Sequence, residues 1–297
     1  MATNKFLKRI VAPDIAVGEA KQGDIASQIH NYTHGINSDP LTILAIVFSA
    51  LIHDVDHQGV SNLQLITENK DMGDKYKNKS VAEQNSLDLA WELLMQDKFI
   101  KLRNCLFTTE AELKRFRQVI VNVVLATDIF DPELNGLRKQ RWEKAFSGDQ
   151  GLSEEEENDL RATIVIEHII QASDVSHPMQ HWHVYRKWNK RLFQELHLAF
   201  RQGRMGKDPS EFWYNGELGF FDNYIIPLAK KLKECNVFGV SSDECLNYAL
   251  QNREEWKEKG QQIVDEMMKE LAPTIEAHKK RSSLRVVNEE EAKECAK

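Results

Sequence analysis

The feature that most constrains the fold is an almost wholly apolar run over residues 41–52, LTILAIVFSALI, in which only Thr42 and Ser49 are polar. Asp39 before it is a good N-cap, and Pro40 suits the first helical position. The run therefore predicts a helix. A helix that is apolar on every side belongs at the centre of an all-α domain and not on its surface.

The rest of the chain also favours helices, because it lacks the alternating Val, Ile and Thr runs that are typical of strands. Ser80, followed three positions later by Glu83, matches a capping box. Helices are predicted over 62–69, 80–95, 108–126, 153–170, 182–200, 216–232 and 242–271, and irregular connections over 12–37, 71–78 and 128–152. We predict an all-α fold, a compact multi-helix bundle with one domain over 1–283 and a polar tail over 284–297.

Size and charge narrow the class of protein. The 297 residues suit one large domain, and the net charge of −7 argues against nucleic acid as a partner. No stretch approaches the ~18 consecutive apolar residues of a membrane span, so no membrane segment is predicted in this chain. The four cysteines lack metal-type spacing, which favours reduced thiols and a cytoplasmic protein.

A cluster of metal-ligand residues follows the apolar run directly. His53, Asp54, Asp56 and His57 fall within five positions. Each is costly to bury unpaired, and a divalent cation removes that cost because imidazole and carboxylate are its natural ligands. If the helix continued, His53 would share a face with Asp56 or His57, and Asp54 would point about 100° away. A buried ion pair is the alternative, which the second Asp-His pair disfavours.

A metal site here needs a further ligand from elsewhere in the chain, and Asp174 is the best candidate. It follows the apolar run 164–170, where a helix is expected to stop before Pro178. A capping role is the alternative for an aspartate at such a position.

Residues 53–62, HDVDHQGVSN, resemble the signature of the class I 3′,5′-cyclic-nucleotide phosphodiesterases, a branch of the His-Asp metal-hydrolase superfamily. The resemblance covers about residues 5–280. Further stretches that resemble this family are DPLTILAIVFSAL at 39–51, SVAEQN at 80–85, VLATD at 124–128, ASDVSHP at 172–178, VYRKW at 184–188 and LGFFD at 218–222.

The resemblance implies a reaction that depends on two divalent metal ions. His53, Asp54 and Asp174 would bind the first ion, typically Zn²⁺, and Asp54 would bridge to a second, typically Mg²⁺ or Mn²⁺. Water activated by both ions would open the 3′ ester of a cyclic nucleotide to leave a 5′-monophosphate. Three further positions would orient the waters of the second metal: His57, Glu83 and Thr127.

The resemblance also implies a substrate pocket, in which Leu192 and Phe220 would clamp the purine. For these two residues, core packing is the alternative. At Glu217 the chain departs from the family, which has a glutamine that bonds the purine edge. A carboxylate only accepts hydrogen bonds, so it suits the two donors of guanine and favours cyclic GMP. A solvated glutamate at a helix start is the alternative.

A second departure concerns the family's upstream motif, His-Asn-x-x-His, which supplies the general acid and one more ligand of the first metal. Residues 30–34, HNYTH, match it as a string. A helix over 40–53 spans about 20 Å, and the six residues before it reach about 20 Å only when fully stretched. We therefore interpret the match as a coincidence in a loop. We expect the true motif before Met1, which would make this chain a truncated and feeble catalyst.

Two other functions stay open. A pseudoenzyme that binds metal or nucleotide would retain the cluster without turnover. Another His-Asp nucleotide phosphohydrolase is a further alternative, although Gly59 and Asn62 after the second Asp-His pair argue against it. The family would supply a cyclic nucleotide as the partner and a possible regulatory or membrane domain N-terminal to this chain.

Overall fold

The computed structural model describes residues 2–10, 22–146 and 153–294, and these form helices and turns without any β-strand. The all-α prediction is therefore confirmed. The helices are α1 (Ala2–Leu7), α2 (Gln22–Tyr32), α3 (Pro40–Ile52), α4 (Asn62–Glu68), α5 (Lys70–Lys75), α6 (Val81–Met95), α7 (Ile100–Leu106), α8 (Glu110–Leu125), α9 (Pro132–Phe146), α10 (Glu154–Asp174), η3 (His177–Met179), α11 (Trp182–Arg201), α12 (Trp213–Phe220), the π-helix η5 (Phe221–Ile225), α13 (Ile226–Glu234) and α14 (Glu244–Glu294).

Helix α3 begins as its sequence predicts. Asp39 Oδ1 accepts hydrogen bonds from the backbone N–H groups of Leu41 and Thr42, at 3.1 and 3.3 Å. Its burial is less complete than predicted, because Leu44, Val47 and Leu51 form an exposed stripe at helical spacing, with Leu51 77% exposed. The described helices that pack on α3, chiefly α8, α1 and α10, contact its other faces.

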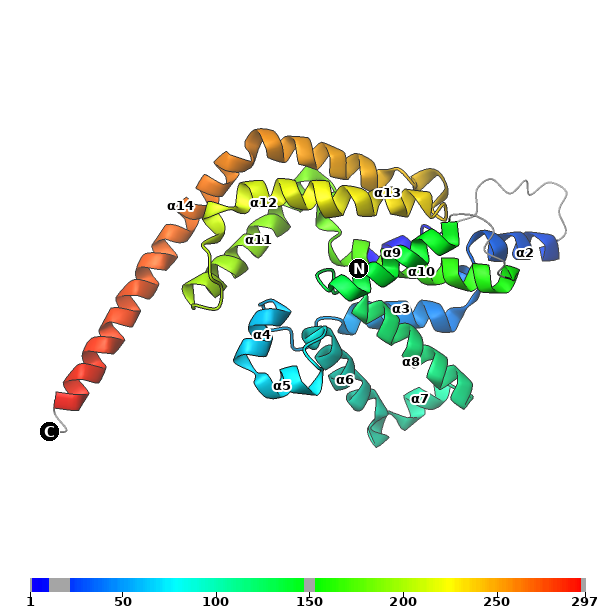
Figure 1. Cartoon of the computed structure of the whole chain (residues 1–297), viewed down its shortest axis with the longest axis horizontal. Coiled ribbons are helices and arrows are strands. Elements are labelled where there is room, and N and C mark those ends of the chain that lie inside the picture. The colour runs from blue at the N-terminus through cyan, green and yellow to red at the C-terminus, as the bar shows by residue number, and fades with distance from the viewer. Residues whose placement is uncertain (1, 11–21, 147–152, 295–297) are drawn as a thin grey trace.

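A small cluster packs α4 and the end of α5 against the start of α6, and two larger apolar cores hold the other helices together. The larger one joins α10 to α11, η5, α13 and α14, and Tyr185 lies within it against Phe221 and Trp256. The smaller one packs α3 against α6 and α8 around Phe116 and Ile120. In Figure 1 α13 and the first part of α14 run along one side of the molecule, and α4 to α7 lie on the other.

Two stretches expected to be irregular are helical, because polar side chains start the helices. Asn69 Oδ1 accepts from the Met72 N–H at 3.1 Å and opens α5 within the predicted loop 71–78. Asp131 Oδ1 accepts from the N–H groups of Glu133 and Leu134 and opens α9 within 128–152.

The structure differs from two further predictions, at the start of α6 and before α3. The capping box at Ser80 is wrong, since the Ser80 hydroxyl donates to Asp128 and its backbone is left-handed, although α6 begins at the next residue. Helix α2 lies within the expected connection 12–37, of which residues 12–21 are outside the described part.

The long α14 continues past residue 283 to Glu294, and its C-terminal part extends away from the other helices (Figure 1). Throughout the described residues, none of the helices is both long and apolar enough to cross a membrane.

Candidate metal centre

His53 stands at the C-terminal end of α3, where it is the C-cap residue and its N–H donates to the Ser49 carbonyl. Its ring is oriented by the last turn of the helix, because Nδ1 donates to the Ala50 carbonyl oxygen at 3.1 Å. This bond turns the other ring nitrogen, Nε2, away from α3. A ligand histidine held at one nitrogen by a backbone carbonyl is a common arrangement in metal sites.

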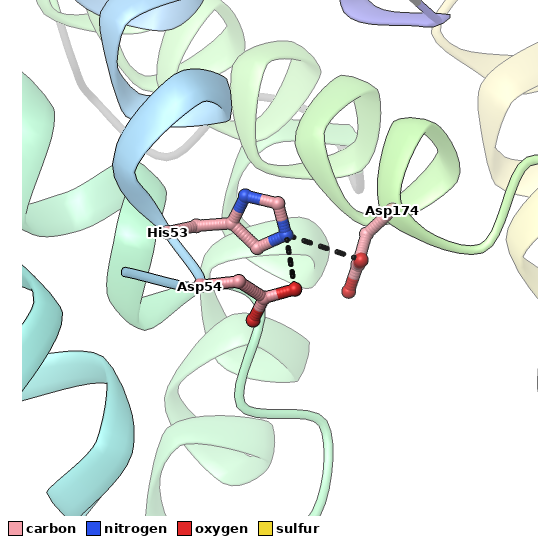
Figure 2. A group of neighbouring side chains, drawn as sticks. All are labelled: His53, Asp54 and Asp174. Carbon is pink, nitrogen blue, oxygen red and sulfur yellow. Dashed lines mark hydrogen bonds and ion pairs between the residues drawn. The ribbon is translucent and has the colours of Figure 1, made fainter. Parts of the chain in front are cut away.

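Two carboxylates meet His53 Nε2. Asp54 Oδ2 lies 3.2 Å from it and Asp174 Oδ1 lies 3.3 Å from it, and one ligand atom from each residue falls within 4.8 Å of the others (Figure 2). Asp174 is the last residue of α10, so two helices that are far apart in sequence bring the three side chains together. Among the described residues this is the one group of three or more such side chains.

The carboxylates control the charge of the imidazole. Burial disfavours the imidazolium, but the hydrogen bonds to Asp174 and Asp54 outweigh it and raise the pKa of His53 to about 10. The same bond from His53 lowers the pKa of Asp54. The Asp54 side chain is 64% exposed, so it retains open positions toward solvent. A cation that replaced the shared proton would find one nitrogen and two oxygen donors already in place.

The segment after His53 does not continue the helix. Asp56 has a φ of +63°, which is left-handed, so the predicted helical face shared by His53 with Asp56 or His57 is wrong. Helix α6 holds this turn instead, because Ser86 Oγ donates to the Val55 carbonyl at 2.7 Å and Asn85 Nδ2 donates to Asp56 Oδ2 at 3.2 Å.

Glu83 lies at the start of α6 within a polar network. Asn62 Nδ2 donates to Glu83 Oε2 at 3.0 Å and to Asp128 Oδ2 at 3.4 Å, and Ser80 Oγ donates to the same Asp128 oxygen at 2.8 Å. Burial is the main cause that raises the pKa of Glu83, and the charge of Asp128 adds to it, while Asn62 and His57 oppose it. Glu83 is therefore a half-buried carboxyl group near His57.

His57 and Thr127 have local partners. His57 Nδ1 accepts from the Gly59 N–H at 3.2 Å, and the Thr127 hydroxyl donates to the Val124 carbonyl at 2.7 Å, just after α8 ends. The predicted part of both residues in orienting water stays a prediction.

Glu217 on α12 is 7% exposed and belongs to a directional chain of hydrogen bonds. Trp213 Nε1 donates to Asn189 Oδ1 at 3.2 Å, Asn189 Nδ2 donates to the Tyr185 hydroxyl at 3.3 Å, and that hydroxyl donates to Glu217 Oε2 at 2.7 Å. Burial raises the pKa of Glu217 to about 7, against the opposing hydrogen bonds of Tyr185 and Asn189. The alternative of a solvated glutamate is therefore wrong.

The two residues predicted to clamp a purine come from different helices. Phe220 ends α12, packs against the larger core and stacks on Tyr224 with ring centroids 5.4 Å apart. Leu192 lies on α11 and is 39% exposed, which is unusual for a core leucine. Their role toward a ligand stays a prediction.

The HNYTH string lies at the other end of α3 from the metal centre. His30 is in α2, so its position in a helix differs from the expected loop, and its Nδ1 pairs with Ser38 Oγ. His34 Nδ1 lies 3.4 Å from Asn158 Oδ1 near the start of α10. The length of α3, about 20 Å, separates this region from His53.

Sequence reasoning did not assign a role to several residues that shape the site. Tyr185 and Asp128 occur in the VYRKW and VLATD stretches, so a signal for them was present. Arg204 carries no local signal, because its partners Glu68 and Gln58 are distant in sequence. Asn189 pairs with Tyr185 in the preceding turn of α11 and with Trp213 from another helix.

The described part of the chain is thus an all-helical bundle with a candidate metal centre of one histidine and two aspartates at the ends of two helices. The family model described as 3′5′-cyclic nucleotide phosphodiesterase matches residues 26–242. The chain belongs to this family of 3′,5′-cyclic nucleotide phosphodiesterases.

Individual relatives agree with the family match. A probable 3′,5′-cyclic-AMP phosphodiesterase, pde-4, from Caenorhabditis elegans is 31% identical over 204 residues, which cover 63% of this chain and 29% of that protein. The dual specificity calcium/calmodulin-dependent 3′,5′-cyclic nucleotide phosphodiesterase 1B of Bos taurus is 28% identical over 166 residues, 55% of this chain and 27% of that protein. The chain thus spans less than a third of the length of these relatives.

A solved structure shows the same fold. The phosphodiesterase domain of the RhoPDE fusion protein from the choanoflagellate Salpingoeca rosetta matches with a TM-score of 0.60 and 23% identity. The match covers 81% of this chain and 77% of that one.

Proposed function

We propose that this chain hydrolyses 3′,5′-cyclic nucleotides to 5′-monophosphates at the His53–Asp54–Asp174 group. The observation that carries the proposal is the meeting of these three side chains within 4.8 Å in a chain of the phosphodiesterase family. Membership of this family favours cyclic-nucleotide hydrolysis over another His-Asp phosphohydrolase.

The donor set fits divalent metal ions. One imidazole nitrogen and two carboxylates suit Zn²⁺, and an additional carboxylate oxygen of the exposed Asp54 suits a second ion such as Mg²⁺ or Mn²⁺. When bound, these ions would supply Lewis-acid activation of water and neutralise the phosphate charge.

The other residues of the chain act on water and substrate in this proposal. His57, Glu83 and Thr127 would orient water at the second ion when it is bound. The raised pKa of Glu83 reflects a carboxyl group held away from bulk solvent. Phe220 and Leu192 contact the two faces of the purine. The Tyr185 hydroxyl donates to Glu217 Oε2, and in this proposal Glu217 Oε1 accepts from the purine edge. In the ionised form, which dominates above pH 7, that oxygen only accepts, which favours cyclic GMP over cyclic AMP.

Hydrolysis of cyclic GMP and cyclic AMP in the presence of Zn²⁺ and Mg²⁺ tests the proposal, with Asp174→Asn as the variant. We expect this variant to lose at least about 100-fold in kcat, since it removes a metal ligand. The matched control is Asp159→Asn, which changes an exposed aspartate of the same helix α10. Equal rates for Asp174→Asn and the unaltered chain would contradict the proposed centre.

A metal-binding protein without turnover is the second candidate. The three donors of the candidate centre include only one imidazole, whereas hydrolytic zinc sites often have two or more. This difference favours the second candidate. Metal analysis distinguishes the two: stoichiometric zinc that requires Asp174, together with no hydrolysis of either nucleotide, would favour this second candidate.

A further inference from the structure

The peptide unit between Gln58 and Gly59 lies between two side chains. Its N–H donates to His57 Nδ1 at 3.2 Å, and its carbonyl oxygen accepts from Arg204 Nη1 at 3.1 Å. Both groups belong to one rigid plane. A rotation of this plane would therefore break the bond to Arg204 and the bond to His57 together.

The guanidinium of Arg204 is itself fixed. Its Nε and Nη2 donate to the two carboxylate oxygens of Glu68 on α4, at 2.7 Å each, which is a bidentate pair. Hydrogen bonds from Arg204 and then Gln64 lower the pKa of Glu68 to about 2, so the pair is charged at every ordinary assay pH.

The backbone of Arg204 is anchored as well. Its N–H donates to the Ala199 carbonyl at 2.9 Å, and Gly203 has a φ of +72°, which together close the C-terminus of α11 in a Schellman motif. The guanidinium thus joins the end of α11 to α4 and to the turn after the metal ligands.

The turn that Arg204 contacts, residues 56–59, has a constrained backbone. Asp56 and Gly59 both have left-handed φ values, +63° and +67°. Gln58 Nε2 donates back to the Asp56 carbonyl at 2.9 Å, and Gly59 faces Glu195 of α11. In this constrained turn, the Arg204 guanidinium supplies the hydrogen-bond donor that the Gln58 carbonyl faces.

A neutral imidazole that accepts a hydrogen bond at Nδ1 carries its proton on Nε2. We propose that Arg204 is a positioning residue: through the Gln58–Gly59 peptide unit it holds His57 in the tautomer with the proton on Nε2. This rests on the proposed function, in which His57 orients water for hydrolysis. The tautomer then decides whether His57 presents a donor or an acceptor to that water.

The test combines ¹⁵N NMR of labelled histidine, with the His57 signals assigned by difference from His57→Gln, and kinetics with cyclic GMP. The variants are Arg204→Gln, which loses the fork and the charge, and Arg204→Lys, which keeps a charge for Glu68 but has no fork to reach Gln58 as well. We expect both variants to mix the two tautomers of His57. We also expect kcat to fall about tenfold or more, with KM changed by less than about twofold.

The matched control is Arg253→Lys, because Arg253 of α14 makes a similar bidentate pair with Asp222, at 2.9 Å for each bond. It is expected to lower the melting temperature as much as Arg204→Lys while leaving the His57 signals and kcat unchanged. Unaltered His57 signals in Arg204→Lys would overturn the proposal, whether or not kcat falls, and this variant also decides the matter if Arg204→Gln fails to fold. The NMR comparison needs no turnover, so it is decided separately from the hydrolytic function.

Discussion

Glu217 is a buried carboxyl group that accepts a hydrogen bond from Tyr185, and its protonation is linked to folding. In the unfolded chain it titrates near its ordinary pKa of 4.5, whereas burial raises the pKa in the folded protein to about 7. Between these values the folded state binds more protons than the unfolded state. The free energy of unfolding therefore falls as the pH rises from 4.5 to 7 and is level beyond that.

Glu217→Gln is expected to remove this pH-dependent fall in the free energy of unfolding. The shift corresponds to roughly 3 kcal/mol, so the variant gains about that much stability relative to the unaltered chain between pH 4.5 and pH 8. Urea unfolding at several pH values measures the difference. Glu211→Gln, at an exposed glutamate before α12, is the control. A pH-independent difference for Glu217→Gln would show that the carboxyl group is ionised throughout.

The metal-ligand residues of the site could be predicted from the sequence because of their side-chain chemistry. His53, Asp54 and Asp174 are metal-ligand types at the ends of apolar runs, so their chemistry is visible in the sequence itself. The partner of Glu217 was not predictable in this way. Tyr185 lies 32 positions away and donates to Glu217 only because α11 and α12 pack against the same core.

At the scale of the element, helix α14 is tightly packed at Gly260. A Cβ added at Gly260 would lie 2.7 Å from the Trp256 ring, which is fully buried and donates from Nε1 to the Tyr214 carbonyl. The indole therefore has no room to move. Gly136 in α9 is the opposite case, since a Cβ there would meet nothing within 4 Å.

The two glycines are expected to respond oppositely to alanine. Gly260→Ala forces an overpacked core and is expected to destabilise the fold by about 1–3 kcal/mol. Gly136→Ala gains helix propensity without a clash and is expected to stabilise by about 0.5–1 kcal/mol. Urea unfolding of both variants provides the comparison. Stabilisation by Gly260→Ala would mean that Trp256 can shift.

Helices were predictable where a long amphipathic or apolar period was present, as in α3, α8 and α11. The short α5 and the polar α9 have weak periodicity, and their starts depend on caps from Asn69 and Asp131. Caps of this kind are common in loops too, so a polar sequence alone did not distinguish a helix start from a loop. The end of α3 at Ile52 was likewise set by the turn at Asp56.

At the scale of the whole molecule, the candidate metal centre connects distant parts of the chain. His53 ends α3, which belongs to both apolar cores, and Asp174 ends α10 in the larger one, 121 positions later. A bound ion would therefore add to the packing and to the single His53–Asp174 contact that join the ends of these two helices. Binding to the folded state alone stabilises that state by mass action.

Zn²⁺ at about 100 times its Kd is expected to stabilise the protein by about 2.7 kcal/mol, which raises Tm by several degrees. Thermal melts with Zn²⁺ and then with a chelator measure this rise and its reversal. Asp174→Asn should abolish the rise, and Asp159→Asn should retain it. An equal rise in both variants would place the stabilising ion elsewhere.

Both helices meet the centre with their C-terminal ends. Aligned peptide dipoles leave roughly half a negative charge at each such end, in addition to the charges of Asp54 and Asp174. Before any metal binds, this region attracts cations and repels a phosphate. The protein is therefore expected to load in a fixed order, with the metal ions first and the cyclic nucleotide only after them.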